Sequence, residues 1–192
     1  MTPQEGGAAF AAGSARGACL PPDQRLLTPD GYVAVAAIDV RDRVITGQGR
    51  ARLVLGLDCR PSAGSLCRLR TGRGHVLRVA GGQPVLARRQ EGVAEWVPAA
   101  ALHPGDLAAV FGLHLLPAFA RGGPGPEAPS AGGRGGPLVA MRREVIPCQA
   151  VDWETVATAD IVPYRGPAYR VEIEEDHSFV SEGWIVAEFG AG

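Results

Sequence analysis

The chain has 192 residues, of which 46% are hydrophobic, and it carries a net charge of -1 with a pI near 6.4. Proteins that bind nucleic acid usually present a basic patch, so we expect no nucleic-acid partner. No apolar run approaches the roughly 18 residues of a membrane span, and residues 1–18 lack the basic start and apolar core of a signal peptide. We therefore expect one cytoplasmic domain without a membrane partner.

Short apolar stretches separated by turn residues predict an all-β chain. Residues 26–33 contain a Pro-Asp-Gly turn and predict a hairpin, because proline fixes φ and glycine accepts a positive φ. Residues 35–45 predict a strand, a tight turn and another strand. The next expected strands cover residues 50–60, 66–71, 75–79 and 84–88, with turns at residues 62–65 and 72–74.

The second half of the chain differs from the first by a helical turn and a linker. Residues 99–103 predict the helical turn. Residues 121–137 are rich in Gly and Pro and cannot bury enough apolar surface to offset their ordering entropy, so we expect a flexible linker inside the domain. Strand patterning resumes in four segments, at residues 141–145, 151–156, 169–174 and 179–187. The expected organisation is a flank (1–18), a domain (19–188) and a tail (189–192).

Two parts of the chain repeat each other at an offset of 102 residues. The repeated pairs are Asp58 and Asp160, Pro61 and Pro163, Gly64 and Gly166, Arg68 and Arg170, His75 and His177, and Gly81 and Gly183. Such a repeat predicts two copies of one β unit, each needing the other to bury its apolar face. We expect a pseudo-two-fold module in which Arg68 and Arg170 occupy equivalent places.

The four cysteines do not form a metal-binding pattern. Cys19, Cys59, Cys67 and Cys148 contain no C-x-x-C pair and do not cluster with histidine, so we expect no metal and no other cofactor. Cys59 and Cys67 lie in apolar runs and are expected, like Cys148, to be small buried hydrophobes. Their spacing leaves a disulfide open, but no secretory signal favours one.

Five motifs occur in the order found in Hint domains, the fold shared by inteins and hedgehog autoprocessing domains. They are Cys19-Leu-Pro-Pro with Leu27-Thr-Pro-Asp-Gly, then residues 77–86, 96–107, 169–180 and 183–188. From Cys19 to Glu188 the chain therefore resembles a mini-intein or a bacterial intein-like domain without a homing endonuclease, and with degenerate splicing motifs. The resemblance implies a horseshoe-like all-β fold with pseudo-two-fold internal duplication.

The resemblance places the family's nucleophile at Cys19. Its thiolate would attack the carbonyl carbon of Ala18 and convert the peptide bond into a thioester, an N-to-S acyl shift. In the family, the histidine of a Thr-x-x-His motif protonates the departing nitrogen, and here Ala80 and Gln83 stand at those positions. Gln83 can form hydrogen bonds but cannot deliver a proton at neutral pH, so cleavage should be slow.

The last motif departs further from the family. Inteins cyclise a terminal asparagine beside a histidine and before Cys, Ser or Thr, whereas this chain has Ala187, Glu188 and Phe189 there. The sequence contains no asparagine, and the carboxylate of Glu188 lacks the amide nitrogen that cyclisation needs. Arg170 also replaces the usual aspartate. We therefore expect no protein splicing.

The remaining polar candidates each have two interpretations. His177 matches the histidine of the penultimate motif and is a catalytic candidate, but its counterpart His75 in the other repeat favours a structural histidine. Arg170 could pair with a carboxylate such as Glu172 or Glu174, or lie on a solvated strand face. His103 and His114 have no partner that the sequence identifies.

Two classes of function follow. The first is an inactive Hint domain retained as a structural or interaction module, with an unidentified protein partner, in the cytoplasm or in a phage particle or virion. The second is an autoprocessing domain that cleaves once at Ala18-Cys19, without a cofactor. Varied replacements at four motif positions and short flanks favour the first class, with residual cleavage at most.

Overall fold

The computed structural model describes residues 19–89, 92–112 and 151–188. Strands dominate these ranges, joined by turns and by two short 3-10 helices. Neither of these helices, the only ones in the described ranges, is long and apolar enough to cross a membrane. The expected linker (residues 121–137), His114 and Cys148 lie outside the described residues.

The first hairpin follows the turn chemistry of the sequence. Strands β1 (Arg25–Thr28) and β2 (Gly31–Ala34) pair antiparallel, and Gly31 has a φ of 121°. The prediction of a strand directly after this hairpin is wrong, because Val35–Ala37 forms the 3-10 helix η1. The backbone N–H groups of Val35 and Ala36 donate to the carbonyls of Gln24 and Pro22, which turns the chain back onto its own start.

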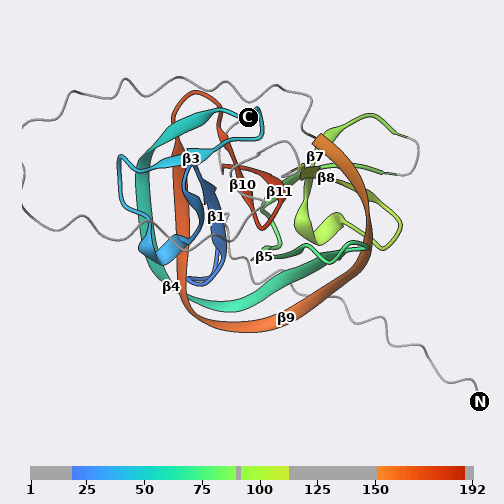
Figure 1. Ribbon diagram of the computed structural model, residues 1–192. Coiled ribbons are helices and arrows are strands. Elements are labelled where there is room, and N and C mark those ends of the chain that lie inside the picture. The colour runs from blue at the N-terminus through green and yellow to red at the C-terminus, as the bar shows by residue number, and fades with distance from the viewer. Residues whose placement is uncertain (1–18, 90–91, 113–150, 189–192) are drawn as a thin grey trace, which may run out of the picture.

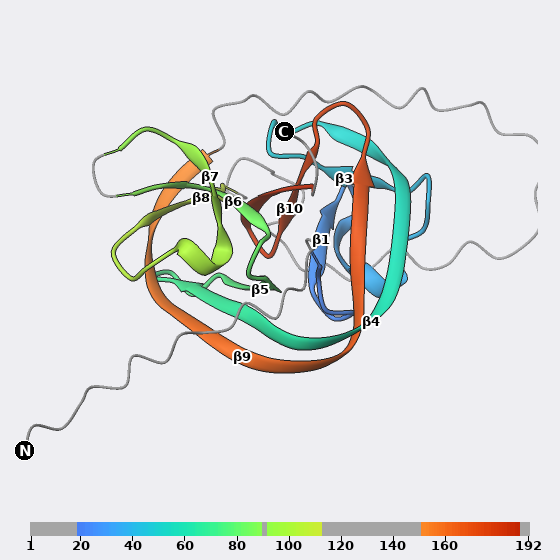
Figure 2. The ribbon, with the colours of Figure 1, turned by 180° about the vertical axis from the view of Figure 1, so that it is seen from behind.

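Two very long strands form a curved ribbon around the other strands (Figures 1 and 2). Strand β4 (Ala51–Thr71) pairs antiparallel with β9 (Val151–Ile173) over almost their full lengths. The turn expected at residues 62–65 is therefore wrong, and so is the division of β9 into two strands. Proline and glycine are tolerated here because the middle of the ribbon has only two strands, both of them edge strands.

The register of this ribbon relates the two sequence repeats. Asp58 on β4 lies opposite Arg170 on β9, and Arg68 on β4 lies opposite Asp160 on β9. A two-fold axis through the ribbon would exchange these two pairs. It would place Asp58 on Asp160 and Arg68 on Arg170, and each of these matches is the 102-residue offset of the repeat. Arg68 and Arg170 thus have matching partners across the ribbon, each lying opposite an aspartate.

The shorter strands complete one sheet with the ribbon. They are β3 (Arg43–Ile45), β5 (Val76–Ala80), β6 (Pro84–Arg88), β7 (Glu95–Pro98), β8 (Leu107–Phe111), β10 (Ser178–Ser181) and β11 (Trp184–Ala187). The order is β2-β1-β10-β11-β6-β8-β9-β4-β3, with β5 on β4 and β7 on β6. The helical turn expected near residue 99 is present as η2 (Ala99–Ala101).

One large apolar cluster, with a smaller one beside the first hairpin, forms the core of the described residues. Trp184 and Leu77 are fully buried there, together with Ile173 from the ribbon and Phe179 from β10. Both sequence repeats contribute to this cluster. Trp184 also fixes the place of the short strand β11. This strand pairs with β6, and the residue after it, Glu188, binds β9, where the candidate site lies.

Candidate functional site

Cys19 lies beside the ribbon at the start of the described chain. Its neighbour Leu20 exchanges two backbone hydrogen bonds of 2.9 Å with Tyr169 on β9. Its own carbonyl accepts a hydrogen bond of 3.0 Å from the backbone N–H of Ala80. The candidate nucleophile is thus held between β9 and the end of β5, while Ala18, whose carbonyl it would attack, is outside the described residues.

The surroundings of Cys19 oppose its ionisation. Burial raises the pKa of the Cys19 thiol above its ordinary value, the guanidinium of Arg170 lowers this pKa, and the carboxylate of Asp58 raises it. Burial is the largest of these effects. A thiol with a raised pKa supplies less thiolate at neutral pH and is a weaker nucleophile in practice.

Gln83 forms a structural bridge to the last strand. Its side chain is buried, and Nε2 donates a hydrogen bond to the carbonyl of Ala187. Its backbone N–H donates to Ala80, the same residue whose N–H binds Cys19. The residue at the general-acid position therefore joins the end of β11 to the turn after β5.

The carboxylate of Glu188 is fixed by two donors. Oε2 accepts a hydrogen bond of 2.6 Å from the backbone N–H of Ile173, and Oε1 lies 2.5 Å from Nδ1 of His177. The backbone N–H of Glu188 also donates to the carbonyl of His177 at 2.8 Å. Glu188 therefore anchors the end of β11 to β9 and to the turn that follows β9.

A buried aspartate holds the turn that carries His177. The carboxylate of Asp176 is fully buried and accepts hydrogen bonds from Thr46 Oγ1 at 2.6 Å and from Arg50 Nε at 2.9 Å. His177 itself has a φ of 46°, a conformation that this anchored turn maintains. Sequence reasoning missed the role of Asp176, although it directly precedes the histidine of the quoted motif.

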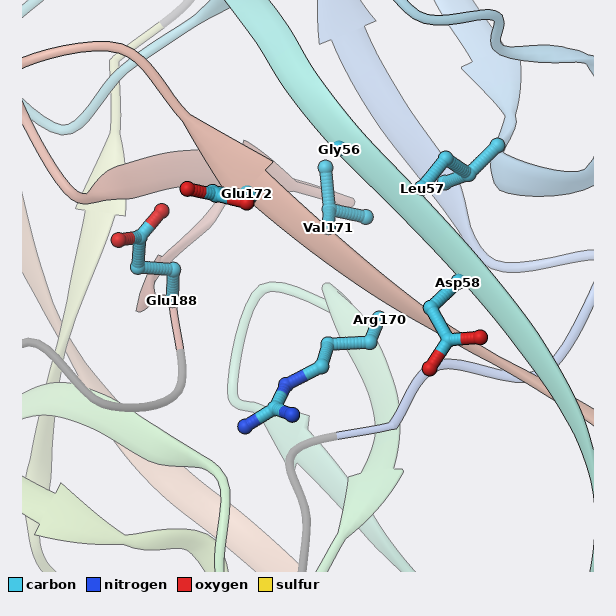
Figure 3. A pocket seen from close by; sticks show the side chains of 7 residues that line it. All are labelled: Gly56, Leu57, Asp58, Arg170, Val171, Glu172 and Glu188. Carbon is cyan, nitrogen blue, oxygen red and sulfur yellow. The ribbon is translucent and has the colours of Figure 1, made fainter.

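An open pocket of about 600 Å³ lies between the ribbon and the end of β11 (Figure 3). Charged side chains line most of it: Asp58, Arg170, Glu172 and Glu188. Gly56 lies opposite Glu172, and a Cβ atom at Gly56 would come within 2.9 Å of Glu172 Oε2. Sequence reasoning missed Asp58, which the antiparallel register places opposite Arg170.

The two repeated histidines occupy matching turns but have different partners. His75 directly precedes β5, and His177 directly precedes β10. Nδ1 of His75 donates to the carbonyl of Glu182 at 3.2 Å, and Nε2 lies 3.7 Å from Oε1 of the buried Glu154. Each histidine thus has a partner on Nδ1, a backbone carbonyl for His75 and the carboxylate of Glu188 for His177.

The prediction that the cysteines are buried is right for one of them and wrong for another. Cys67 is buried as expected, but Cys59 is exposed. Cys59 lies on the two-stranded part of the ribbon, whereas Cys67 lies where β5 adds a third strand and the core covers it. The side chain of His103 is exposed, and its backbone N–H donates to the carboxylate of Asp106.

The predicted site residues thus form one connected arrangement with two parts. Glu188, His177 and Gln83 meet at the end of β11, while Cys19 lies on the other side of Ala80 and near Arg170. Hydrogen bonds between fixed groups dominate the first part. The second part offers a thiol beside a guanidinium and a carboxylate.

Comparisons with solved structures identify this architecture. The protein is similar to a variant of the Ssp DnaB mini-intein (TM-score 0.61, 12% identity, 90% of this chain and 94% of that chain). It is also similar to a bacterial intein-like domain from Clostridium thermocellum (TM-score 0.58, 15% identity, 88% and 97%) and to the gp41-1 intein (TM-score 0.56, 12% identity, 90% and 99%).

These likenesses show the fold. No family model matches the sequence, and no curated protein matches it. The class is that of all-β proteins with the Hint fold, and within it the chain has the architecture of inteins and mini-inteins. The chain spans nearly the whole length of the mini-inteins to which it is similar.

Proposed function

We propose that this protein is a splicing-incompetent Hint domain that serves as a structural or interaction module. The observation that carries the proposal is the structural role of the residues at two positions where the catalytic residues of the family are replaced. Gln83 and Glu188, which stand for the general acid and the terminal asparagine, both hold the end of β11 in place. Groups committed to such bonds stabilise one conformation rather than supply protons or a cyclising amide.

The chemistry of Glu188 supports the loss of splicing. Asparagine cyclisation needs an amide nitrogen that attacks the residue's own carbonyl carbon, and a carboxylate has none. Both oxygens of Glu188 are engaged, one by the N–H of Ile173 and one by His177. An interaction module needs a protein partner, so we propose that this protein is part of a larger assembly. The setting that we propose for it is the cytoplasm, or a phage particle or virion.

A second candidate function is slow autoprocessing at Ala18-Cys19. It is favoured by Arg170, whose guanidinium lowers the pKa of the Cys19 thiol and so favours the thiolate. In this reaction the sulfur bonds to the carbonyl carbon of Ala18, the C–N bond breaks, and the nitrogen of Cys19 takes a proton. A missing general acid usually costs about 10² to 10⁴ in rate.

Intact mass spectrometry of freshly purified protein, with and without dithiothreitol, separates the two functions. We expect the full mass to persist for days, because burial suppresses the thiolate and Gln83 cannot protonate the leaving nitrogen. The double variant Ala80→Thr with Gln83→His restores the acid motif, and it should remain intact if Cys19 is inactive. Cys19→Ala serves as the control for any loss of residues 1–18.

Two outcomes would change the assignment. Rapid thiol-dependent loss of residues 1–18 from the unmodified chain, abolished by Cys19→Ala, would make autoprocessing the function. His177→Ala would then be the next variant, since another general acid would be required. Cleavage only in the double variant would leave the natural chain inactive and show that the scaffold around Cys19 is preserved.

A further inference from the structure

One face of the sheet formed by β7, β6, β8 and the start of β9 is turned away from the large apolar cluster. Side chains alternate along each strand, so every second residue lies on this face. Val85, Ala87 and Val97 are fully buried on the inner face, and their neighbours lie on the outer one. These four strands lie together on one side of the molecule, as Figure 2 shows for β6, β7 and β8, and β5 and the first hairpin are elsewhere.

The strand register gathers two tryptophans and an arginine on the outer face. Trp96 lies opposite Leu86, and Arg88 lies two residues further along the same strand as Leu86. Arg88 lies opposite Leu107, and Trp153 lies opposite Ala109 two residues further along β8. We call Leu86, Arg88, Trp96, Leu107 and Trp153 the Trp96 face.

The aromatic side chains make this face unusual for a solvated surface. Trp96 is 46% exposed, a large apolar area for a residue in the middle of a short strand. Leu86, Leu107 and Trp153 are only partly buried. Exposed tryptophan next to aliphatic side chains is typical of protein interfaces, where it supplies much of the binding energy.

Arg88 is a positive charge held in place on the Trp96 face. Its guanidinium carbon lies 4.1 Å from the ring centroid of Trp153, a cation-π stack that fixes its position. Its Nε atom is buried and has no hydrogen-bond partner among the described residues. By contrast, the neighbouring Arg89 has an acidic partner, Glu95, at 3.7 Å.

We propose that the Trp96 face docks a segment of a partner protein that presents a carboxylate to Arg88 between apolar side chains. The carboxylate would accept hydrogen bonds from the guanidinium, which is oriented by Trp153 and already partly desolvated. The flanking apolar side chains would pack on Trp96 and Leu86 and exclude water from the charge pair. This inference rests on the proposed function as an interaction module and names the chemistry of its partner.

The probe is a fluorescein-labelled peptide of eight residues that alternates leucine with glutamate, and its control has glutamine in place of glutamate. Fluorescence polarisation against the full chain should show binding of the glutamate peptide and much weaker binding of the glutamine peptide. Arg88→Gln should weaken binding of the glutamate peptide about tenfold, as expected for a charge-assisted contact. Trp96→Ala should weaken it about fivefold or more.

The matched control is Arg89→Gln, which removes the same charge from the adjacent residue. Its effect on the dissociation constant should stay within about twofold, because an exposed ion pair contributes little. Circular dichroism and thermal melting verify that each variant remains folded. Trp96 is half exposed and Arg88 is only partly buried on the outer face, so neither change removes a residue of the apolar core.

Three results would overturn the proposal. They are equal binding of the glutamate and glutamine peptides, an Arg88→Gln variant that binds as the unmodified chain does, and no binding at about 1 mM peptide. Dimerisation in sedimentation equilibrium that Trp96→Ala abolishes would assign the face to a second copy instead. Mass spectrometry of cleavage is independent of Arg88, so failure here and failure of the proposed function are distinguishable.

Discussion

The thiol of Cys19 lies near charges of opposite sign. Arg170 lowers its pKa, Asp58 raises it, and burial, the largest effect, raises it as well. By the motif resemblance, Arg170 stands at the position where inteins usually carry aspartate. The balance of these effects decides how much thiolate is present, and it can be measured without any cleavage.

Alkylation of Cys19 by iodoacetamide should respond to these neighbours in opposite directions. A raised pKa means less thiolate at a given pH below that pKa, and hence slower alkylation. Arg170→Gln removes the group that lowers the pKa, so alkylation at pH 8 should slow by about threefold, less than the tenfold of a full pKa unit. Asp58→Asn should accelerate it, and the pH midpoint should move accordingly.

Glu172→Gln is the control for this experiment. Glu172 lines the same pocket but is not among the groups that shift the pKa of Cys19. Peptide mapping by mass spectrometry follows Cys19 separately from the exposed Cys59. Faster alkylation in Arg170→Gln would contradict the electrostatic account and indicate that Arg170 shields the thiol.

Among the elements, the β10–β11 hairpin depends on a turn with an unusual backbone conformation. Glu182 and Gly183 form its two-residue turn, with φ values of 47° and 90°, between the paired residues Ser181 and Trp184. Turns of this kind suit the twist of the strands but require positive φ at both positions. The turn also contacts the first repeat, since a Cβ atom on Gly183 would lie 2.6 Å from His75 Nδ1.

Gly183→Ala should therefore lower the free energy of unfolding by about 1 to 3 kcal/mol, because it adds a strained φ to a steric clash. Urea denaturation followed by circular dichroism measures the change. Gly64→Ala is the matched control: no atom lies within 4 Å of its added Cβ, and its φ is not in the left-handed region. Its effect should stay within about 0.5 kcal/mol. Equal effects would show that the hairpin turn is not critical.

Local sequence signals predict local elements and fail for long-range ones. The Pro-Asp-Gly turn predicts the first hairpin because its conformation depends only on nearby residues. The same kind of signal at residues 62–65 predicts a turn that is absent. There the partner strand, about one hundred positions away, keeps the backbone extended, as shown by Pro61 lying opposite Pro167.

For the whole molecule, the sequence gives the positions of the candidate site residues in the chain but not their contacts. The resemblance to Hint motifs locates Cys19, Gln83, His177 and Glu188 in the chain. It does not predict that Glu188 binds the N–H of Ile173, or that Asp58 lies opposite Arg170. Those contacts depend on the register between distant strands, which hydrophobic patterning alone does not specify.

The linker prediction also concerns the whole molecule. Replacing residues 121–137 by a Gly/Ser loop of about half the length should change the melting temperature by about 2 °C or less. The reason is that halving a loop alters the closure free energy by only about 0.6 kcal/mol. Differential scanning calorimetry of both proteins measures the change. A drop of many degrees would mean that this segment packs against the domain.

The β4–β9 ribbon has a consequence for how the chain folds. Its strands begin one hundred residues apart, from Ala51 to Val151, so the ribbon can form only after a large loop has closed. Proteins dominated by such distant pairings fold slowly, because the entropy of loop closure is lost before the contacts compensate. Until then each repeat exposes an unpaired strand edge to other chains. A newly made chain is therefore open to aggregation until the ribbon that joins the two repeats has formed.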